Sequence, residues 1–186
     1  MAGLPHYKNG HAGMENWEPV YLNLFEVLIV PPKAVDSWEW IMDNVTKVGG
    51  MDVEKTPSPV EQIYKGAKRR YAGGFPDGTT VDLSISFEVN LNNNNSMYVY
   101  KGLRKWCDLI FDPLTGAMTT KVNYAGGPMT VSLFNKDGVT FRQWIYPVIF
   151  PMSSLPAMEL DYSSGSNIWS IDMTFACDYW EDSSLS

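Results

Sequence analysis

Two segments of this 186-residue chain alternate strictly between apolar and polar residues, and this pattern constrains the fold more than any other feature. The first runs from Val81 to Leu91 and the second from Trp169 to Tyr179. Successive side chains of a β-strand point to opposite faces, so a period of two predicts strands with one face in a core and one polar face. The polar positions of the first segment are Asp82, Ser84, Ser86 and Glu88.

A helical period follows the first alternating segment. Apolar residues recur there at intervals of three and four, at Val99, Leu103, Trp106 and Ile110. This spacing predicts one α-helix at about residues 96–111, with Ser96 as its N-cap and an apolar stripe that covers a sheet. Pro113 is expected to end it.

Shorter apolar or aromatic segments account for the rest of the ordered chain. They predict strands at residues 24–29, 38–48, 63–72, 129–134, 140–149 and 157–162, although the first half of 38–48 is also compatible with a helical turn. Asp137-Gly138 is typical of a hairpin turn. We therefore expect a mainly β protein with one α-helix, built as a two-sheet sandwich or a barrel-like domain. The domain spans residues 21–181, between a flexible arm at 1–20 and a polar tail at 182–186.

The motifs that carry catalysis or cofactor binding are missing from the sequence. His6 and His11 are its only histidines and both fall in the predicted arm, so a catalytic triad lacks a base. Phosphate-binding glycine motifs and calcium loops are absent as well. The carboxylate pairs Glu159/Asp161 and Asp82/Glu88 could serve a glycosidase, but a solvated strand face is favoured in a chain with 21 acidic residues. The sequence thus predicts no enzyme, no metal and no cofactor.

The charge of the chain argues against default binding to nucleic acid. The formal net charge is −7, and a protein with few cations releases few counterions from a phosphate backbone. One local basic cluster stands out, formed by Lys65, Lys68, Arg69 and Arg70. Its flanking tyrosines would suit phosphate binding with base stacking, but pairing with acids of a neighbouring subunit is favoured.

Cysteine use and hydropathy indicate a protein that folds in the cytoplasm. Cys107 and Cys177 are not in a C-x-x-C arrangement and are expected to be reduced thiols. Apolar runs are shorter than ten residues, so no membrane anchor is expected.

Two terminal motifs resemble a known family. Asn23-Leu24-Phe25-Glu26-Val27 stands near the start, and Phe175-Ala176-Cys177-Asp178-Tyr179-Trp180-Glu181 closes the last strand. Between them, Tyr71-Ala72-Gly73-Gly74 leads into an alternating strand and then a helix. This order resembles the tail tube proteins of contractile-tailed bacteriophages, whose plan the tube protein of type VI secretion shares. The long arm and the segment 31–40 depart from that pattern.

The resemblance implies a structural virion protein of the phage tail, assembled in the host cytoplasm. Six subunits would form a ring around a lumen, and rings would stack into a conduit for DNA, which passes through without specific binding. Sheath, baseplate, tape measure and tail terminator proteins are the implied partners. We expect the polar face of residues 82–88, or that of another strand, to line the lumen. The expected ring-stacking loop comprises Gly49, Gly50, Met51, Asp52, Val53, Glu54 and Lys55.

The sequence is also compatible with other functions. The chain could be the tube protein of a type VI system or of a phage-derived contractile injection particle, which differs from a phage tube in its cargo. A carbohydrate-binding β-sandwich with a tryptophan-lined groove is a further possibility.

Overall fold

The computed structural model describes residues 19–35, 39–51, 59–74, 81–91, 94, 96–158, 160–161, 165 and 167–183. Most of the predicted arm, both histidines and the last three residues of the predicted tail lie outside this part of the chain. The described residues form two four-stranded sheets and one two-stranded sheet, which confirms the mainly β prediction.

The first sheet has the antiparallel order β1-β6-β7-β10. Its strands are β1 (Phe25–Ile29), β6 (Met129–Phe134), β7 (Thr140–Tyr146) and β10 (Glu181–Asp182). The predicted hairpin turn joins β6 to β7. Asn135 Oδ1 accepts hydrogen bonds from the backbone N–H groups of Asp137 and Val139, and these bonds hold the turn. Asp182, assigned from the sequence to the polar tail, pairs with Trp144 at the sheet edge.

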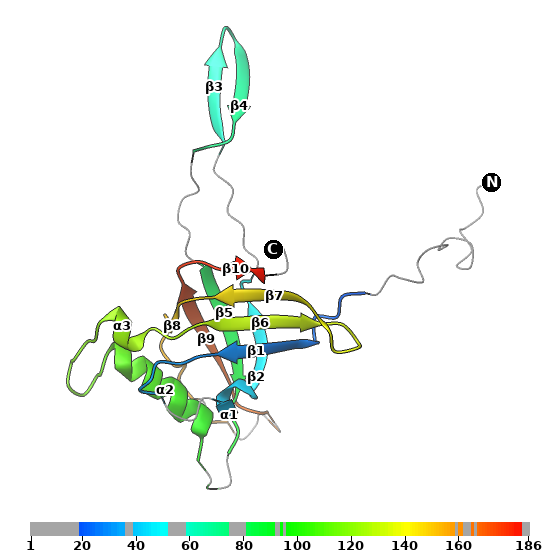
Figure 1. Cartoon of the computed structure of the whole chain (residues 1–186). Helices are drawn as coiled ribbons and strands as arrows, with labels where there is room; N and C mark the ends of the chain where they lie inside the picture. Colours follow the sequence, from blue (N-terminus) through cyan, green and yellow to red (C-terminus); the bar gives the residue numbers. More distant parts are fainter. Residues whose placement is uncertain are drawn as a thin grey trace, which may run out of the picture.

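The second sheet has the order β2-β5-β9-β8. Its strands are β2 (Val45–Gly49), β5 (Val81–Glu88), β9 (Ser170–Cys177) and β8 (Ile149–Pro151). The two alternating segments of the sequence are β5 and β9, and they pair along their full length. Figure 1 shows the strands of the two sheets crossing each other, with the core between them.

The predicted helix is α2 (Tyr98–Ile110), and its apolar stripe is buried at Val99, Leu103 and Trp106. The predicted N-cap was wrong: Met97 holds that position, and Ser96 Oγ instead accepts a hydrogen bond from Lys101 Nζ. Within the described residues, no helix has the length and hydrophobicity needed to cross a membrane.

Three of the predicted strands, at 38–48, 140–149 and 157–162, do not form as single strands in the structure. The segment 38–48 divides into α1 (Glu39–Met42) and β2. The segment 140–149 divides at Pro147, which has no N–H to continue a ladder, into β7 and β8. The described residues of 157–162 form no strand. A short helix, α3 (Lys121–Tyr124), was not predicted.

The segment 63–72 forms most of a hairpin where a single strand was predicted. Strands β3 (Val60–Tyr64) and β4 (Ala67–Tyr71) are joined by Lys65 and Gly66, both with positive φ. Figure 1 shows this hairpin standing apart from the two sheets.

Candidate functional site

The polar faces of the two alternating segments, β5 and β9, lie side by side in the second sheet. The antiparallel register sets each polar residue of β5 beside one of β9. The cross-strand pairs are Asp82 with Ala176, Ser84 with Thr174, Ser86 with Asp172, and Glu88 with Ser170. Carboxylates and hydroxyls therefore cover much of two adjacent central strands, and the position of β9 beside β5 follows only from the register.

The four predicted residues have different surroundings on this face. Asp82 and Ser84 are exposed, whereas Glu88 is half-buried. Ser86 is buried, and its hydroxyl donates a hydrogen bond to Asp172 Oδ1 over 2.5 Å. The polar surface thus contains a cross-strand bond that stiffens it as well as groups open to solvent.

Both margins of the polar face carry a cation. At the β2 margin, Lys47 lies directly opposite Ser86 in the register of β2 and β5. At the β8 margin, Phe150 pairs with Ala176, and Lys121 Nζ lies 5.2 Å from the centre of the Phe150 ring. The same ammonium group lies 2.6 Å from Asp178 Oδ2, so its charge is already paired. The middle of the face remains acidic.

The start of the predicted stacking loop is held against β5. Gly50 has a φ of +80°, and a Cβ added there would lie 2.3 Å from the Asp82 carbonyl oxygen. Met51 is half-buried against the core. The other predicted loop residues, 52–55, lie outside the described residues. The loop therefore begins beside the strand that carries the candidate lumen residues.

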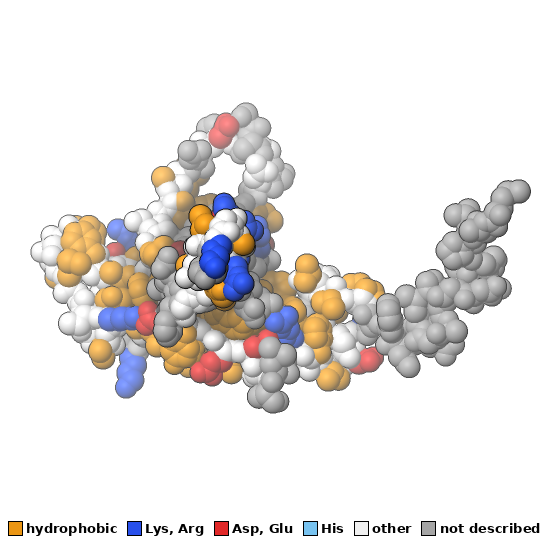
Figure 2. All heavy atoms as spheres, turned by 90° about the horizontal axis from the view of Figure 1, so that it is seen from above, with side chains coloured by type: hydrophobic (Ala, Val, Ile, Leu, Met, Phe, Trp, Pro, Cys, Tyr) orange, Lys and Arg blue, Asp and Glu red, His pale blue; other side chains and the backbone are white. Residues whose placement is uncertain are grey.

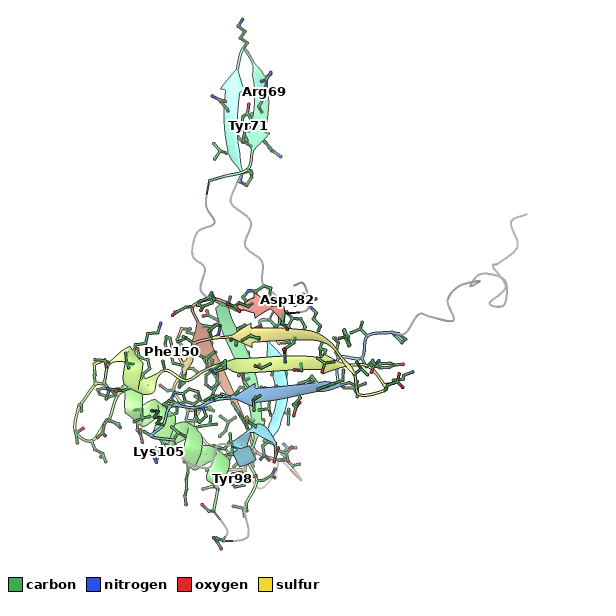
Figure 3. The ribbon with its side chains drawn as sticks, viewed as in Figure 1. Arg69, Tyr71, Tyr98, Lys105, Phe150 and Asp182 are labelled. Carbon is green, nitrogen blue, oxygen red and sulfur yellow. The ribbon has the colours of Figure 1, made fainter. Side chains whose placement is uncertain are left out.

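The hairpin of β3 and β4 carries the basic cluster. Arg70 Nε lies 2.7 Å from Glu61 Oε1 and Lys68 Nζ 3.6 Å from Glu61 Oε2, so one acid serves two cations. Figure 2 shows Lys and Arg side chains gathered on the hairpin, and Figure 3 places Arg69 and Tyr71 on it, away from the sheets. The sequence feature that could have predicted this hairpin is Gly66, because glycine favours the positive φ that the turn requires.

The described residues hold no group of three or more potential metal ligands. The described cysteines are free thiols. Burial, and then the nearby charge of Asp108, raises the pKa of Cys107 to about 11, and burial also raises the pKa of Cys177. Both groups are therefore protonated near neutral pH and weak as nucleophiles.

Solved structures with the same fold belong to contractile injection systems. A chain of the anti-feeding prophage tube-terminating cap matches with a TM-score of 0.60 and 17% identity, over 89% of this chain and 91% of that one. A chain of the PVC sheath–tube complex in the extended state, an extracellular contractile injection system, matches with a TM-score of 0.60 and 16% identity, over 91% and 94%. A chain of the PVC sheath/tube terminator in the extended state matches with a TM-score of 0.57 and 16% identity, over 90% of this chain and 98% of that one.

No protein-family model and no curated protein matches the sequence. The likeness is therefore one of fold, over nearly the whole length of both chains. The neighbours are structural components of tubes, caps and terminators, which agrees with the resemblance of the terminal motifs. The chain has the tube-like β-fold found in contractile injection systems.

Proposed function

We propose that the chain is a structural subunit of the tube of a contractile tail, in which copies join into hexameric rings that stack around a lumen. The observation that carries this proposal is the continuous polar face of β5 and β9, on a fold shared with tube and cap structures. A tube wall needs this arrangement, because one sheet face must contact the core and the other must contact the contents of the lumen.

The chemistry of that face suits passage of DNA. Asp82, Glu88 and Asp172 give it an excess of negative charge, which repels phosphates and leaves no row of cations to hold them. In this proposal Asp82, Ser84, Ser86 and Glu88 line the lumen, and DNA passes without specific binding.

Contact between rings is assigned to the loop from Gly49 and to the β3–β4 hairpin that follows it. A two-stranded hairpin is marginally stable by itself in water, and the apolar side chains of Val60, Ile63 and Tyr71 are exposed on this one. Its cations also contrast with the net charge of −7 of the whole chain. Contact with another copy would cover the apolar side chains of the hairpin, and acidic groups of that copy would pair with the cations of the hairpin.

The structural neighbours favour a second candidate, the tube of a phage-derived or extracellular contractile injection system, which differs in cargo. These neighbours come from structures of a sheath–tube complex, a sheath/tube terminator and a baseplate. In either case we propose sheath, baseplate, tape measure and terminator proteins as partners, and assembly in the cytoplasm before incorporation into the particle. Capsid and portal genes beside the coding gene would identify a phage, whose tail would hold this protein in the virion.

The test is electron microscopy of the purified full-length chain, with its mass measured by light scattering. Rings or hollow tubes, and a mass of several subunits, are the expected result. A stable monomer at high concentration, also in the presence of the baseplate components of its own gene cluster, would contradict the proposal.

A further inference from the structure

The β3–β4 hairpin is an incomplete element of the fold. Figure 1 shows it apart from both four-stranded sheets. A two-stranded hairpin is marginally stable in water, and it gains stability from a third strand or from packing against another element. Val60, Ile63 and Tyr71 are 57%, 68% and 49% exposed on it. The hairpin therefore lacks a further strand and a cover for its apolar side chains.

Strand β1 is the described sheet edge that can supply that strand. It has five residues, as β3 and β4 have, and its pairing with β6 shows no register shift. The other edges of the four-stranded sheets are shorter or irregular. β10 has two residues, β8 has three and ends at Pro151, and β2 has a register shift between Val45 and Lys47. A regular, open edge such as that of β1 is a template for pairing with another chain.

The backbone of β1 bonds to β6 on one side only. Phe134 N–H donates to the Leu24 carbonyl, so the even-numbered positions along β1 bond to β6. By the alternation of an antiparallel pair, Phe25 and Val27 direct their N–H and C=O groups to the opposite side. We call this side the free edge of β1.

A cleft of about 480 Å³ lies beside the free edge, between β1 and β2. We call it the edge cleft. Ile29 N–H lies 3.0 Å from Met42 Sδ in its lining, which places the free edge against the cleft. The described lining includes two exposed acids, Glu26 and Asp43, and no base. Its apolar residues are Phe25, Val27, Leu28, Met42 and Val45.

The hairpin is basic, whereas the rest of the chain is acidic. Residues 60–71 contain four cations and one acid, a net charge of +3. The whole chain carries −7, so the residues outside the hairpin carry −10. Within the hairpin, Glu61 pairs with both Lys68 and Arg70, and the excess of three positive charges remains after this pairing.

The charges that would meet in a contact are not already paired. Among the described residues, no cation forms an ion pair with Glu26 or Asp43. No described acid forms an ion pair with Arg69. The hairpin and the edge cleft therefore match in apolar character and are opposite in available charge.

The hairpin and the free edge lie at opposite ends of the first sheet. The strand order is β1-β6-β7-β10, and Figure 1 shows the hairpin beyond β10 with β1 at the far edge. The hairpin thus stands away from the edge cleft of its own chain. Copies stacked in one orientation bring the hairpin of one to the free edge of the next. A head-to-tail contact of this kind repeats along an axis.

We propose that the β3–β4 hairpin of one copy pairs with the free edge of β1 in a copy of the next ring. Strand β4 lies beside β1, because β4 carries three of the four cations. The apolar side chains of the hairpin cover the edge cleft, and its cations pair with Glu26 and Asp43. This inference rests on the proposed function and names the surface that the hairpin meets between rings.

An exchange of charge between the two surfaces tests the contact. The hairpin variant combines Lys68→Glu with Arg69→Glu and keeps the pair of Arg70 with Glu61. The cleft variant combines Glu26→Lys with Asp43→Lys. All four replaced side chains are exposed, so the fold is retained. The exchanged chain carries all four replacements, which restores opposite charges on the two surfaces.

Electron microscopy and sedimentation of the full-length chains measure stacking. The hairpin variant and the cleft variant should each form rings that do not stack, and the exchanged chain should form tubes again. Lys105→Glu and Asp137→Lys, exposed outside both surfaces, are the controls and should form tubes as the wild type does. Tubes from either reversed variant, or an exchanged chain that forms none, overturn the hairpin contact and leave ring assembly standing.

Hydrogen exchange reports the backbone pairing itself. The amides of Phe25 and Val27 should exchange more slowly in wild-type tubes than in rings of the hairpin variant. Equal exchange overturns the pairing with β1. Slow exchange that depends on the hairpin in wild-type monomers would put the hairpin on its own chain and overturn the contact between copies. A wild-type chain that forms neither rings nor tubes, with its baseplate components present, overturns both proposals.

Discussion

The Ser86 hydroxyl on β5 donates a hydrogen bond to the Asp172 carboxylate on β9, with 2.5 Å between Oγ and Oδ1. The two residues lie directly opposite each other in the central pair of the second sheet. This bond joins the two strands on the face that we assign to the lumen.

Replacing Ser86 tests how much this bond stabilises the sheet. Ser86→Ala is expected to lower the free energy of unfolding by about 1 kcal/mol, because Asp172 is exposed and regains water. Ser84→Ala, at an exposed position of the same face, should change it by less than about 0.5 kcal/mol. Urea unfolding followed by circular dichroism measures both, and equal effects would remove the special role of Ser86.

Charge reversal tests the lumen assignment. Tubes carrying Asp82→Lys and Glu88→Lys should retain short duplex DNA at low salt and release it at high salt, because cations on the wall would hold phosphates. The measurement is co-sedimentation of labelled DNA with the tubes. Asp137→Lys, in the exposed β6–β7 turn, is the control and should retain none. If the double reversal changes neither assembly nor the passage and retention of DNA, these residues do not line the lumen.

The contact between α2 and the sheets depends on Trp106. Its side chain is fully buried, Nε1 donates to the Tyr124 carbonyl over 2.7 Å, and its ring centre lies 5.5 Å from that of Phe175. Trp106→Ala should cost about 3–5 kcal/mol through the cavity it leaves. Trp106→Phe should cost about 1–3 kcal/mol, mainly through the unpaired Tyr124 carbonyl. Thermal and urea unfolding distinguish the two, and a neutral Trp106→Phe would show that the hydrogen bond contributes little.

The start of the predicted stacking loop offers a matched pair of glycines. Gly50 and Gly116 have φ of +80° and +70°, but only at Gly50 would a Cβ meet backbone within 4 Å. Gly116→Ala should therefore cost about 1 kcal/mol of conformational strain, and Gly50→Ala more than that, because β5 must also shift. The difference between the two urea midpoints measures the destabilisation caused by the steric clash at position 50. Equal midpoints would show that no such clash occurs.

Stability should fall at high pH because of Cys107. Its pKa is raised from 9.0 to about 11, so the folded state binds the proton more tightly than the unfolded state does. The contribution is complete below pH 9 and is lost as pH rises through about 11. Because tyrosines and lysines also titrate there, the measurement is the difference between wild type and Cys107→Ala in urea titrations at pH 8, 9, 10 and 11. If the difference in free energy of unfolding between wild type and Cys107→Ala stayed constant from pH 8 to pH 11, the predicted contribution of Cys107 would be wrong.

Local periodicity predicted the central strands and the helix well. The alternation in β5 and β9 reports two faces whatever the partner strand is, and the spacing of Val99, Leu103 and Trp106 reports one buried helical stripe. The predicted strands were wrong where a single glycine or proline interrupts a segment of otherwise strand-like composition. Gly66 turns a predicted strand into a hairpin, and Pro147 divides another.

The sequence by itself determined that this is a mainly β chain, with strands of two-sided character and one amphipathic helix, because those patterns depend only on which side chains avoid water. Tertiary structure alone decided that β5 lies beside β9, that Ser86 is buried against Asp172, and that the edges of β1 and β2 border one cleft. Strand order and register depend on contacts between residues far apart in the chain, and no local period encodes those contacts.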